Sequence, residues 1–222
     1  MMSNLRNKNF TVDTNAALRY LGYRGKPADA ETLTLIQDCS AQLEGCVTPR
    51  SLLRRLPAEV KDGSVTISGV TFRSRDLSEH LKGCMEAVLF AATLGTPADT
   101  LQRRYGKTDM ARAVILHACE AAYVESYCDF VCGKLSNQIK PEGLYLRPRY
   151  SPGYGDFDIR HQADLLGILD APKKIGLTMT DSFMLAPSKS VTAVVGLTKE
   201  AKSCHIAKCM ECKSINCPFR KD

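Results

Sequence analysis

A long helical pattern near the middle of the chain constrains the fold most. Over residues 108–136, apolar residues recur at spacings of three and four, the period of one helix face. This stripe consists of Met110, Ala113, Val114, Ala118, Ala121, Cys128, Val131 and Leu135. Glu125 falls on the same face, four residues after Ala121 and three before Cys128. Because a buried carboxylate is unfavourable when unpaired, Glu125 is predicted to be either a structural partner of a core arginine or a site residue.

Shorter segments on both sides of this helix indicate a mixture of helices and strands. Helices are predicted for residues 13–22, 29–46, 76–84 and 161–171, a hairpin for 63–72, and strands for 87–94, 174–180 and 190–197. Since helices come first and strands late, the order favours an α+β fold over a doubly wound sheet. We expect a twisted, mainly antiparallel sheet flanked by helices, with a helical N-terminal part over about residues 1–60. One domain would span residues 1–200, followed by a Cys-rich C-terminal tail over 201–222.

Composition and charge exclude several classes of protein. The 222 residues are 44% hydrophobic and 24% charged, which is ordinary for a globular chain with a sizeable core. A net charge of +6, without aromatic residues interleaved among the cations, falls short of a nucleic-acid-binding signal. The longest apolar run, 87–94, cannot cross a bilayer, and the N-terminus has no apolar leader segment. We therefore expect a cytoplasmic protein without nucleic-acid or membrane partners.

The C-terminal tail carries a cysteine motif of the form C-x4-C-x2-C-x4-C. Its members are Cys204, Cys209, Cys212 and Cys217. Four thiolates at this spacing match a site for zinc or for an iron–sulfur cluster, and the Cys-Pro ending favours the cluster. The alternative is four reduced, unliganded cysteines, which would be open to oxidation. The other six cysteines are predicted to be core residues, and His80, His117 and His161 to be structural or surface residues.

A glycine-rich segment at residues 149–156 (RYSPGYGD) places a cation on a tight turn. Gly153 and Gly155 permit positive φ and let backbone amides approach a ligand closely, while Pro152 stiffens the segment. Arg149 on such a turn suits a carboxylate or another flat polar ligand. The alternative is a turn between strands with a solvated arginine. The sequence has no phosphate-binding glycine loop, nucleophile elbow or triad, so nothing predicts acid–base catalysis by the protein itself.

Several of these segments together resemble the reactivation, or S-adenosylmethionine-binding, domain of cobalamin-dependent methionine synthase, and most closely its short free-standing bacterial forms. The resemblance rests on residues 149–156, on 178–184 (TMTDSFM) with Pro187, on 190–193 (SVTA) and on helix residues 123–127 (YVESY). It covers about residues 85 to 197.

The resemblance implies a function in the repair of a corrinoid cofactor. Such domains bind S-adenosylmethionine beside a cobalamin held on a partner and support the reductive methylation of cob(II)alamin. The electron comes from a flavodoxin- or ferredoxin-like donor. The hard chemistry belongs to the cofactor, while the protein supplies binding and alignment.

The resemblance also assigns roles to individual residues. Glu125 matches a buried glutamate near the methionine moiety or ribose, and Arg149 matches the arginine that pairs with the carboxylate of S-adenosylmethionine. Ser151 matches a residue that offers backbone hydrogen bonds, and Tyr154 matches the tyrosine that faces the corrin. Asp181 stands where the fusion enzyme has a glutamate, one methylene longer.

Two departures from the family pattern leave two functional hypotheses. A downstream tyrosine that contacts S-adenosylmethionine in long family members has no counterpart, and only Asp13 is available as their N-terminal aspartate. The first hypothesis is a reactivation partner that acts in trans on a methionine synthase or other corrinoid protein, with an iron–sulfur tail that relays the electron. The second is a non-catalytic docking module for a corrinoid protein, with a structural zinc tail.

Overall fold

The described part of the chain, residues 10–23 and 26–200 of a computed structural model, has the α+β architecture expected from the order of its elements. A six-stranded sheet has the order β3-β2-β1-β4-β8-β5, and each neighbouring pair is antiparallel. Its strands are β1 (Arg50–Lys61), β2 (Ser64–Ile67), β3 (Val70–Arg73), β4 (Glu86–Thr93), β5 (Tyr145–Leu146) and β8 (Ser190–Thr198). A separate hairpin pairs β6 (Thr178–Met179) with β7 (Leu185–Ala186).

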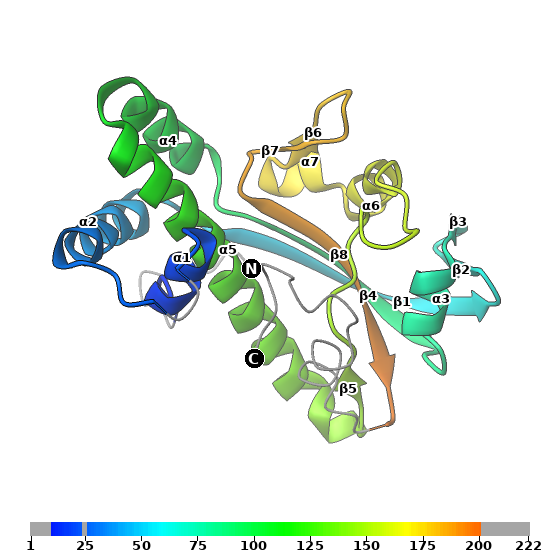
Figure 1. Cartoon of the computed structure of the whole chain (residues 1–222). Helices are drawn as coiled ribbons and strands as arrows, with labels where there is room; N and C mark the ends of the chain where they lie inside the picture. Colours follow the sequence, from blue (N-terminus) through cyan, green and yellow to red (C-terminus); the bar gives the residue numbers. More distant parts are fainter. Residues whose placement is uncertain (1–9, 24–25, 201–222) are drawn as a thin grey trace.

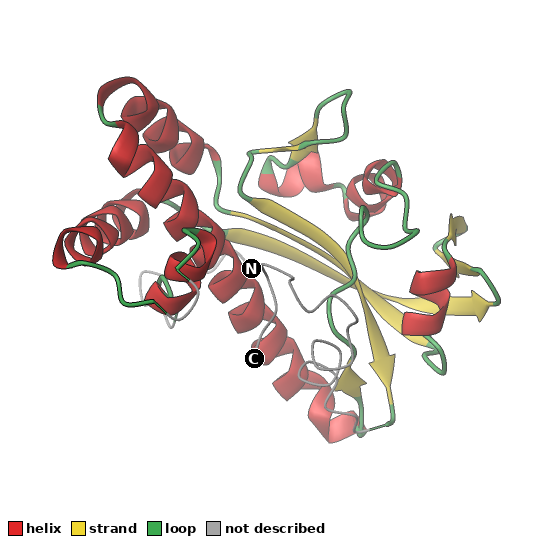
Figure 2. Ribbon diagram, in the orientation of Figure 1, coloured by secondary structure: helices red, strands yellow, loops and turns green. Residues whose placement is uncertain are grey.

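Helices cover both faces of this sheet (Figures 1 and 2). One group consists of α1 (Thr14–Tyr20), α2 (Ala30–Cys46), α4 (Thr96–Thr108) and the long α5 (Met110–Ile139), which runs into a short 3-10 turn (Lys140–Glu142). The other group consists of α3 (Arg75–His80), α6 (His161–Leu169) and α7 (Ala171–Ile175). Each group packs on its own apolar core, so the sheet forms a middle layer.

The central strand β4 explains how the sheet can separate two cores. Its alternate side chains point to opposite faces: Phe90 packs into the core under α5, and Leu89 into the core under α6. All residues of β4 after Glu86 are buried. A strand that is apolar on both faces needs a helical layer on each side, which fits the predicted strand at 87–94.

Helix α5 confirms the strongest prediction from the sequence but is buried over more of its circumference than one stripe. Its N-terminus is capped by Asp109, which accepts a hydrogen bond from the Arg112 amide at 3.0 Å. Met110 and Val114, expected in the apolar stripe, are 67% and 55% exposed. By contrast, Glu120 is 1% exposed, so the periodicity alone did not identify which positions of this helix face the core.

Three segments differ from the sequence predictions. The helical N-terminal part ends at Cys46, because residues 50–61 form β1 rather than a helix. The segment after the strand predicted at 87–94, which its Gly-Thr-Pro sequence (95–97) marks as a turn, instead begins α4, where Pro97 stands in the first turn and has no amide to leave unpaired. The strand predicted over 174–180 forms only as the short β6, because its first two residues end α7, which Gly176 terminates in the left-handed conformation. No helix within the described ranges is long and apolar enough to span a membrane.

Candidate functional site

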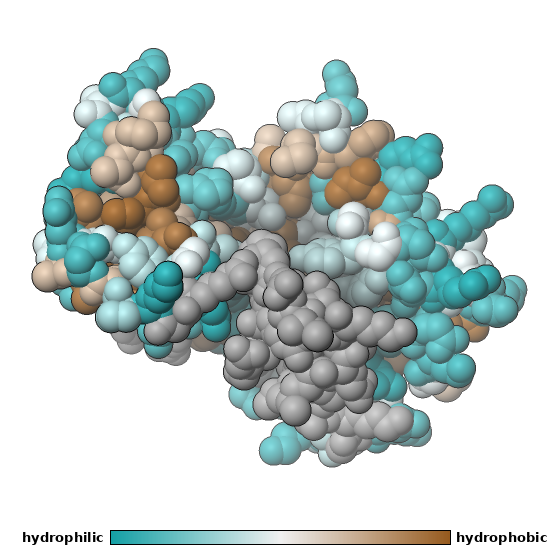
Figure 3. All heavy atoms as spheres, in the orientation of Figure 1, coloured by the Kyte–Doolittle hydropathy of each residue, from teal (hydrophilic) through white to brown (hydrophobic). Residues whose placement is uncertain are grey.

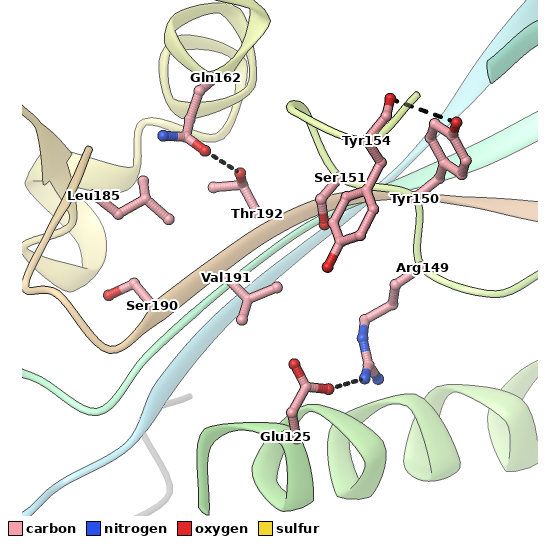
Figure 4. A pocket seen from close by; sticks show the side chains of 10 residues that line it. All are labelled: Glu125, Arg149, Tyr150, Ser151, Tyr154, Gln162, Leu185, Ser190, Val191 and Thr192. Carbon is pink, nitrogen blue, oxygen red and sulfur yellow. Dashed lines mark hydrogen bonds and ion pairs between the residues drawn. The ribbon is translucent and has the colours of Figure 1, made fainter. Parts of the chain in front are cut away.

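A cavity of about 320 Å³ lies between α5, the turn at residues 149–156 and the start of β8 (Figure 4). It is lined by Glu125, Arg149, Tyr150, Ser151, Tyr154, Gln162, Leu185, Ser190, Val191 and Thr192. Four of the five predicted S-adenosylmethionine or corrin contacts are among them: Glu125, Arg149, Ser151 and Tyr154. A volume of this size falls in the range of small-molecule sites, which is ~300–1,000 Å³.

The turn is held in place by its glycines and by α3. Gly153 and Gly155 have φ of 93° and 53°, as the sequence predicted. A Cβ on Gly155 would overlap the Asp76 carboxylate, which accepts a hydrogen bond from the Asp156 amide at 3.1 Å, so a side chain there would displace this contact with α3. Asp156 accepts hydrogen bonds from the backbone amides of Arg75 at 2.8 Å and Asp76 at 3.1 Å. These contacts fix the segment that carries Arg149 at its start.

Arg149 joins the turn to α5 through two ion pairs. Its guanidinium donates to Glu125 Oε2 at 2.7 Å and to Asp129 Oδ1 at 2.8 Å, and it also reaches the sulfur of Cys132 at 3.6 Å. The Arg149 side chain is 17% exposed, whereas that of Glu125 is 45% exposed. Glu125 is therefore the partner of an arginine, which is one of the two roles predicted for it. It is half-exposed, however, and not the buried glutamate that the family resemblance implies.

Arg149 keeps its positive charge in this cluster, where the two carboxylates of Glu125 and Asp129 outnumber it. Desolvation opposes the charge on Arg149, but the neighbouring Cys128, Glu125 and Asp129 outweigh it and raise its pKa. Burial raises the pKa of the Cys132 thiol, so this residue stays protonated at neutral pH. One guanidinium between two carboxylates leaves the cluster with a net negative charge, which suits a ligand that carries positive charge.

Ser151 and Tyr154 occupy different parts of the same pocket. Ser151 lines the wall beside Tyr150, whose ring lies 6.2 Å from that of Phe157 in a stacked arrangement. Tyr154 is 66% exposed, and its ring extends from the turn toward Glu125 of α5 in Figure 4. An exposed aromatic ring at a pocket rim is available to a large flat partner.

Asp181 is the predicted site residue that the structure does not bring to the cavity. It is exposed in the loop between β6 and β7, and it is not among the lining residues. The hydroxyls of its neighbours Thr180 and Ser182 lie 2.9 Å apart and form part of the turn of this hairpin. The sequence motif around Asp181 therefore marks a local turn that supports the pocket wall at Leu185.

The sequence reading missed Gln162, although it closes the far side of the cavity. Gln162 is 5% exposed, donates to the Phe183 carbonyl at 2.6 Å and accepts from the Thr192 hydroxyl at 3.2 Å. It thereby connects α6, the β6–β7 loop and β8. A single glutamine in the first turn of a short helix gives no distinctive pattern, so only the tertiary structure could identify it.

The predicted metal site lies outside the described residues, because the structure describes none of the tail after residue 200. Among the residues that it does describe, no group of histidines, cysteines and carboxylates could hold a metal ion. Cys39, Cys84, Cys119 and Cys128 are buried free thiols, as predicted for core residues, whereas Cys46 is exposed.

Comparisons with known proteins agree with this fold. A family model described as "Vitamin B12 dependent methionine synthase, activation domain" matches residues 85–214. Among solved structures, the chain is similar to the MetH reactivation domain bound to AdoHcy, with a TM-score of 0.59 and 18% sequence identity. That alignment covers 78% of this chain and 67% of the other. No curated protein matches the chain.

Proposed function

The chain belongs to the family of vitamin B12 dependent methionine synthase activation domains, and we propose that its pocket binds S-adenosylmethionine to reactivate a corrinoid protein. The solved relative with the same fold binds AdoHcy, the demethylated form of this donor. The observation that carries the proposal is the Arg149 guanidinium, held in the pocket wall beside the carboxylate of Glu125 at 2.7 Å.

The two charged groups suit the amino-acid end of the donor. A guanidinium has five N–H groups in a planar fork, so Arg149 can keep its carboxylate partners and still donate to a ligand carboxylate. Glu125 is half-exposed on the pocket side and can accept from an ammonium group. The net negative charge of the cluster with Asp129 favours the sulfonium form of the donor over a neutral thioether.

The surface around the pocket suits a large partner. Figure 3 shows apolar side chains gathered on two sides of a hollow. One group lies over the N-terminal part of α5, and the other lies over α6 and α7. Exposed apolar residues include Val114 on α5, Ile159 just before α6, and Met184 on the β6–β7 loop. With Tyr154 at the rim, they provide a docking face for the corrinoid-bearing domain of a methionine synthase or related protein.

When bound, S-adenosylmethionine would supply the methyl group, and a flavodoxin- or ferredoxin-like donor would supply the electron for reductive methylation of cob(II)alamin. The residues of this chain would bind and orient. Arg149 and Glu125 would hold the amino-acid end, Ser151 would contribute backbone hydrogen bonds, and Tyr154 would face the corrin. No proton transfer by the protein is required in this proposal.

Calorimetry with S-adenosylmethionine tests the pocket. We expect Arg149→Ala to weaken binding by about 10- to 100-fold, the value of one charge-assisted hydrogen-bonded pair. Arg55→Ala is the matched control, because Arg55 also pairs with two carboxylates, Glu86 and Glu142, at a site that does not line the pocket. Absence of binding by the wild type, or equal binding by the Arg149 variant, would contradict the assignment.

A turnover assay separates a reactivation partner from a docking module. The protein is incubated anaerobically with S-adenosylmethionine, a chemical reductant and a corrinoid protein in the cob(II) state. We expect the visible spectrum to change to that of methylcob(III)alamin only when this chain is present, and more slowly with Tyr154→Ala. Complex formation without any methylation would instead support the non-catalytic docking hypothesis.

We further propose that the tail over residues 201–222 follows a separate domain of residues 1–200 and holds an iron–sulfur cluster that relays the electron. The proposed ligands are Cys204, Cys209, Cys212 and Cys217. Anaerobic purification should give visible absorption and iron that are lost in Cys209→Ser but kept in Cys46→Ser, a control at an exposed thiol. Zinc, or no metal, would exclude the relay.

A further inference from the structure

A second glutamate on α5 is buried without a hydrogen-bonding partner. Glu120 is 1% exposed, and neither of its carboxylate oxygens has a hydrogen bond to any residue that the structure describes. Within the described part of the chain, its single ion pair is with Lys189 Nζ, 3.7 Å from Glu120 Oε2. A buried carboxylate normally receives several hydrogen bonds, so this one occupies an unfavourable position that the core packing imposes.

Lys189 lies immediately before β8 and is tied to its surroundings. Its side chain is 12% exposed, and its ammonium is 3.2 Å from His117 Nδ1 and 3.3 Å from the His117 carbonyl. Its own carbonyl accepts from the Leu94 amide at 2.9 Å, at the end of β4. The cation is thus fixed between α5 and the edge where β4 and β8 begin to pair.

The residues on both sides of Lys189 are also held. The Ser188 amide donates to the Asp99 carboxylate of α4 at 3.2 Å, and the Ser190 hydroxyl donates to Thr93 of β4 at 2.8 Å. The next residues along β8, Val191 and Thr192, line the pocket. A movement of Lys189 away from α5 would therefore move one wall of the pocket.

We propose that Glu120 is a positioning residue whose protonation controls how firmly the start of β8 is held against α5. The start of β8 carries Ser190, Val191 and Thr192, which form one side of the pocket and are called the strand wall. Glu120 precedes Glu125 by five residues on the same helix, so its pairing with Lys189 connects the two walls between which a ligand would lie. The effect on the donor rests on the proposed function; the movement of the wall does not.

The charged groups around Glu120 set the direction of the effect. Burial raises the pKa of Glu120 to about 7; Lys189 lowers it, and Asp99 on α4 raises it further. His117 on α5 is kept neutral because burial and Lys189 lower its pKa, and burial raises the pKa of the neighbouring Cys119 thiol. When the wall opens, water reaches the carboxylate and its pKa returns toward 4.5.

Linkage then predicts that rising pH favours the open wall. The closed form binds the proton more tightly, so deprotonation shifts the population toward the form in which Glu120 is hydrated. Between pH 6 and pH 8 the opening equilibrium constant should rise by up to about tenfold. Glu120→Gln keeps the shape without the charge and should remove this pH dependence.

Amide hydrogen exchange of the ligand-free protein tests the wall directly. After correction for the intrinsic pH dependence of exchange, amides of residues 188–194 should exchange up to about tenfold faster at pH 8 than at pH 6. Amides of the hairpin at residues 64–73 should show no such change. Glu86→Gln, which removes an exposed ion pair with Arg55, should behave as the wild type. A wild-type profile without pH dependence, or the same dependence in Glu120→Gln, would overturn the proposal.

A second measurement connects the wall to the pocket. The affinity for S-adenosylmethionine of the wild type, relative to that of Glu120→Gln, should be severalfold lower at pH 8 than at pH 6. Identical pH profiles of affinity would show that the wall does not control the pocket. If the wild type binds no donor at either pH, the proposed function fails, whereas the exchange measurement still decides whether Glu120 controls the wall.

Discussion

The turn at residues 149–156 and the start of β8 face each other across one pocket, yet different forces hold them. The turn depends on backbone geometry, since Gly153 and Gly155 adopt positive φ and Asp156 accepts amide hydrogen bonds from α3. The strand wall depends on Lys189 and the buried carboxylate of Glu120, 3.7 Å apart. Hydrogen bonds to Asp156 therefore hold the turn, whereas the strand wall is held by an ion pair whose carboxylate, Glu120, is buried away from water.

This difference gives the two walls opposite responses to pH. Hydrogen bonds from Ser74 and α3 lower the pKa of Asp156, so its contribution is present above its unfolded value near 3.8 and is lost in more acidic solution. The pKa of Glu120 is raised, so its protonated form is favoured in the fold and stability falls as pH rises from about 4.5 to about 7. Near neutral pH only the strand wall should respond.

The largest expected effect is on the turn. Gly155→Ala should lower the free energy of unfolding by about 3 kcal/mol, because the new Cβ meets Asp76 and Tyr150 and the residue has a φ of 53°. Gly106→Ala is the control, since no atom lies within 4 Å of its Cβ position in α4, and it should gain about 0.5–1 kcal/mol. Urea denaturation of both variants measures the difference. Equal changes would mean that the turn has no steric requirement for glycine.

The next effect concerns the strand wall and needs no ligand. The unfolding free energy of Glu120→Gln, relative to that of the wild type, should rise by about 2 kcal/mol between pH 5 and pH 7. The wild type loses this stability because the folded protein releases the Glu120 proton at a pKa of about 7 and the unfolded chain does so near 4.5. Denaturation at several pH values measures the trend. A constant difference between the two proteins would show that Glu120 titrates normally.

The two walls also differ in how far the sequence could predict them. The glycine turn and its cation followed from local patterns, because positive φ and a cation on a turn are properties of adjacent residues, whereas the ion pair of Arg149 with Glu125 appears only in the structure. The pair of Glu120 and Lys189 joins residues far apart in the chain, and α5 is buried on most sides, so its periodicity could not identify the buried carboxylate. β1 was missed for a similar reason: its residues are exposed or half-exposed, so no apolar run marks it, and its strand character depends on pairing with β2 and β4.

Replacing the cation of the strand wall should have a smaller effect that depends on pH. Lys189→Met should destabilise the protein by about 1 kcal/mol more at pH 8 than at pH 6. At pH 8 the Glu120 carboxylate is charged and loses its cation, whereas at pH 6 it is largely protonated. Thermal unfolding at both pH values, with Lys61→Met as a control at an exposed ion pair, measures the difference. A loss that is the same at both values would exclude ionised Glu120 as the partner of Lys189.

The smallest expected effect on stability is at the other glutamate of α5. Glu125→Gln should change the unfolding free energy by only about 0.5 kcal/mol at neutral pH, because its side chain is 45% exposed and Arg149 keeps its ion pair with Asp129. The same substitution should weaken binding of S-adenosylmethionine, which calorimetry measures alongside denaturation. A loss of stability above about 2 kcal/mol would place Glu125 with Glu120 as a structural residue. A small loss together with weak binding would instead separate them, since the half-exposed carboxylate would then serve the ligand and the buried one would hold the wall behind it.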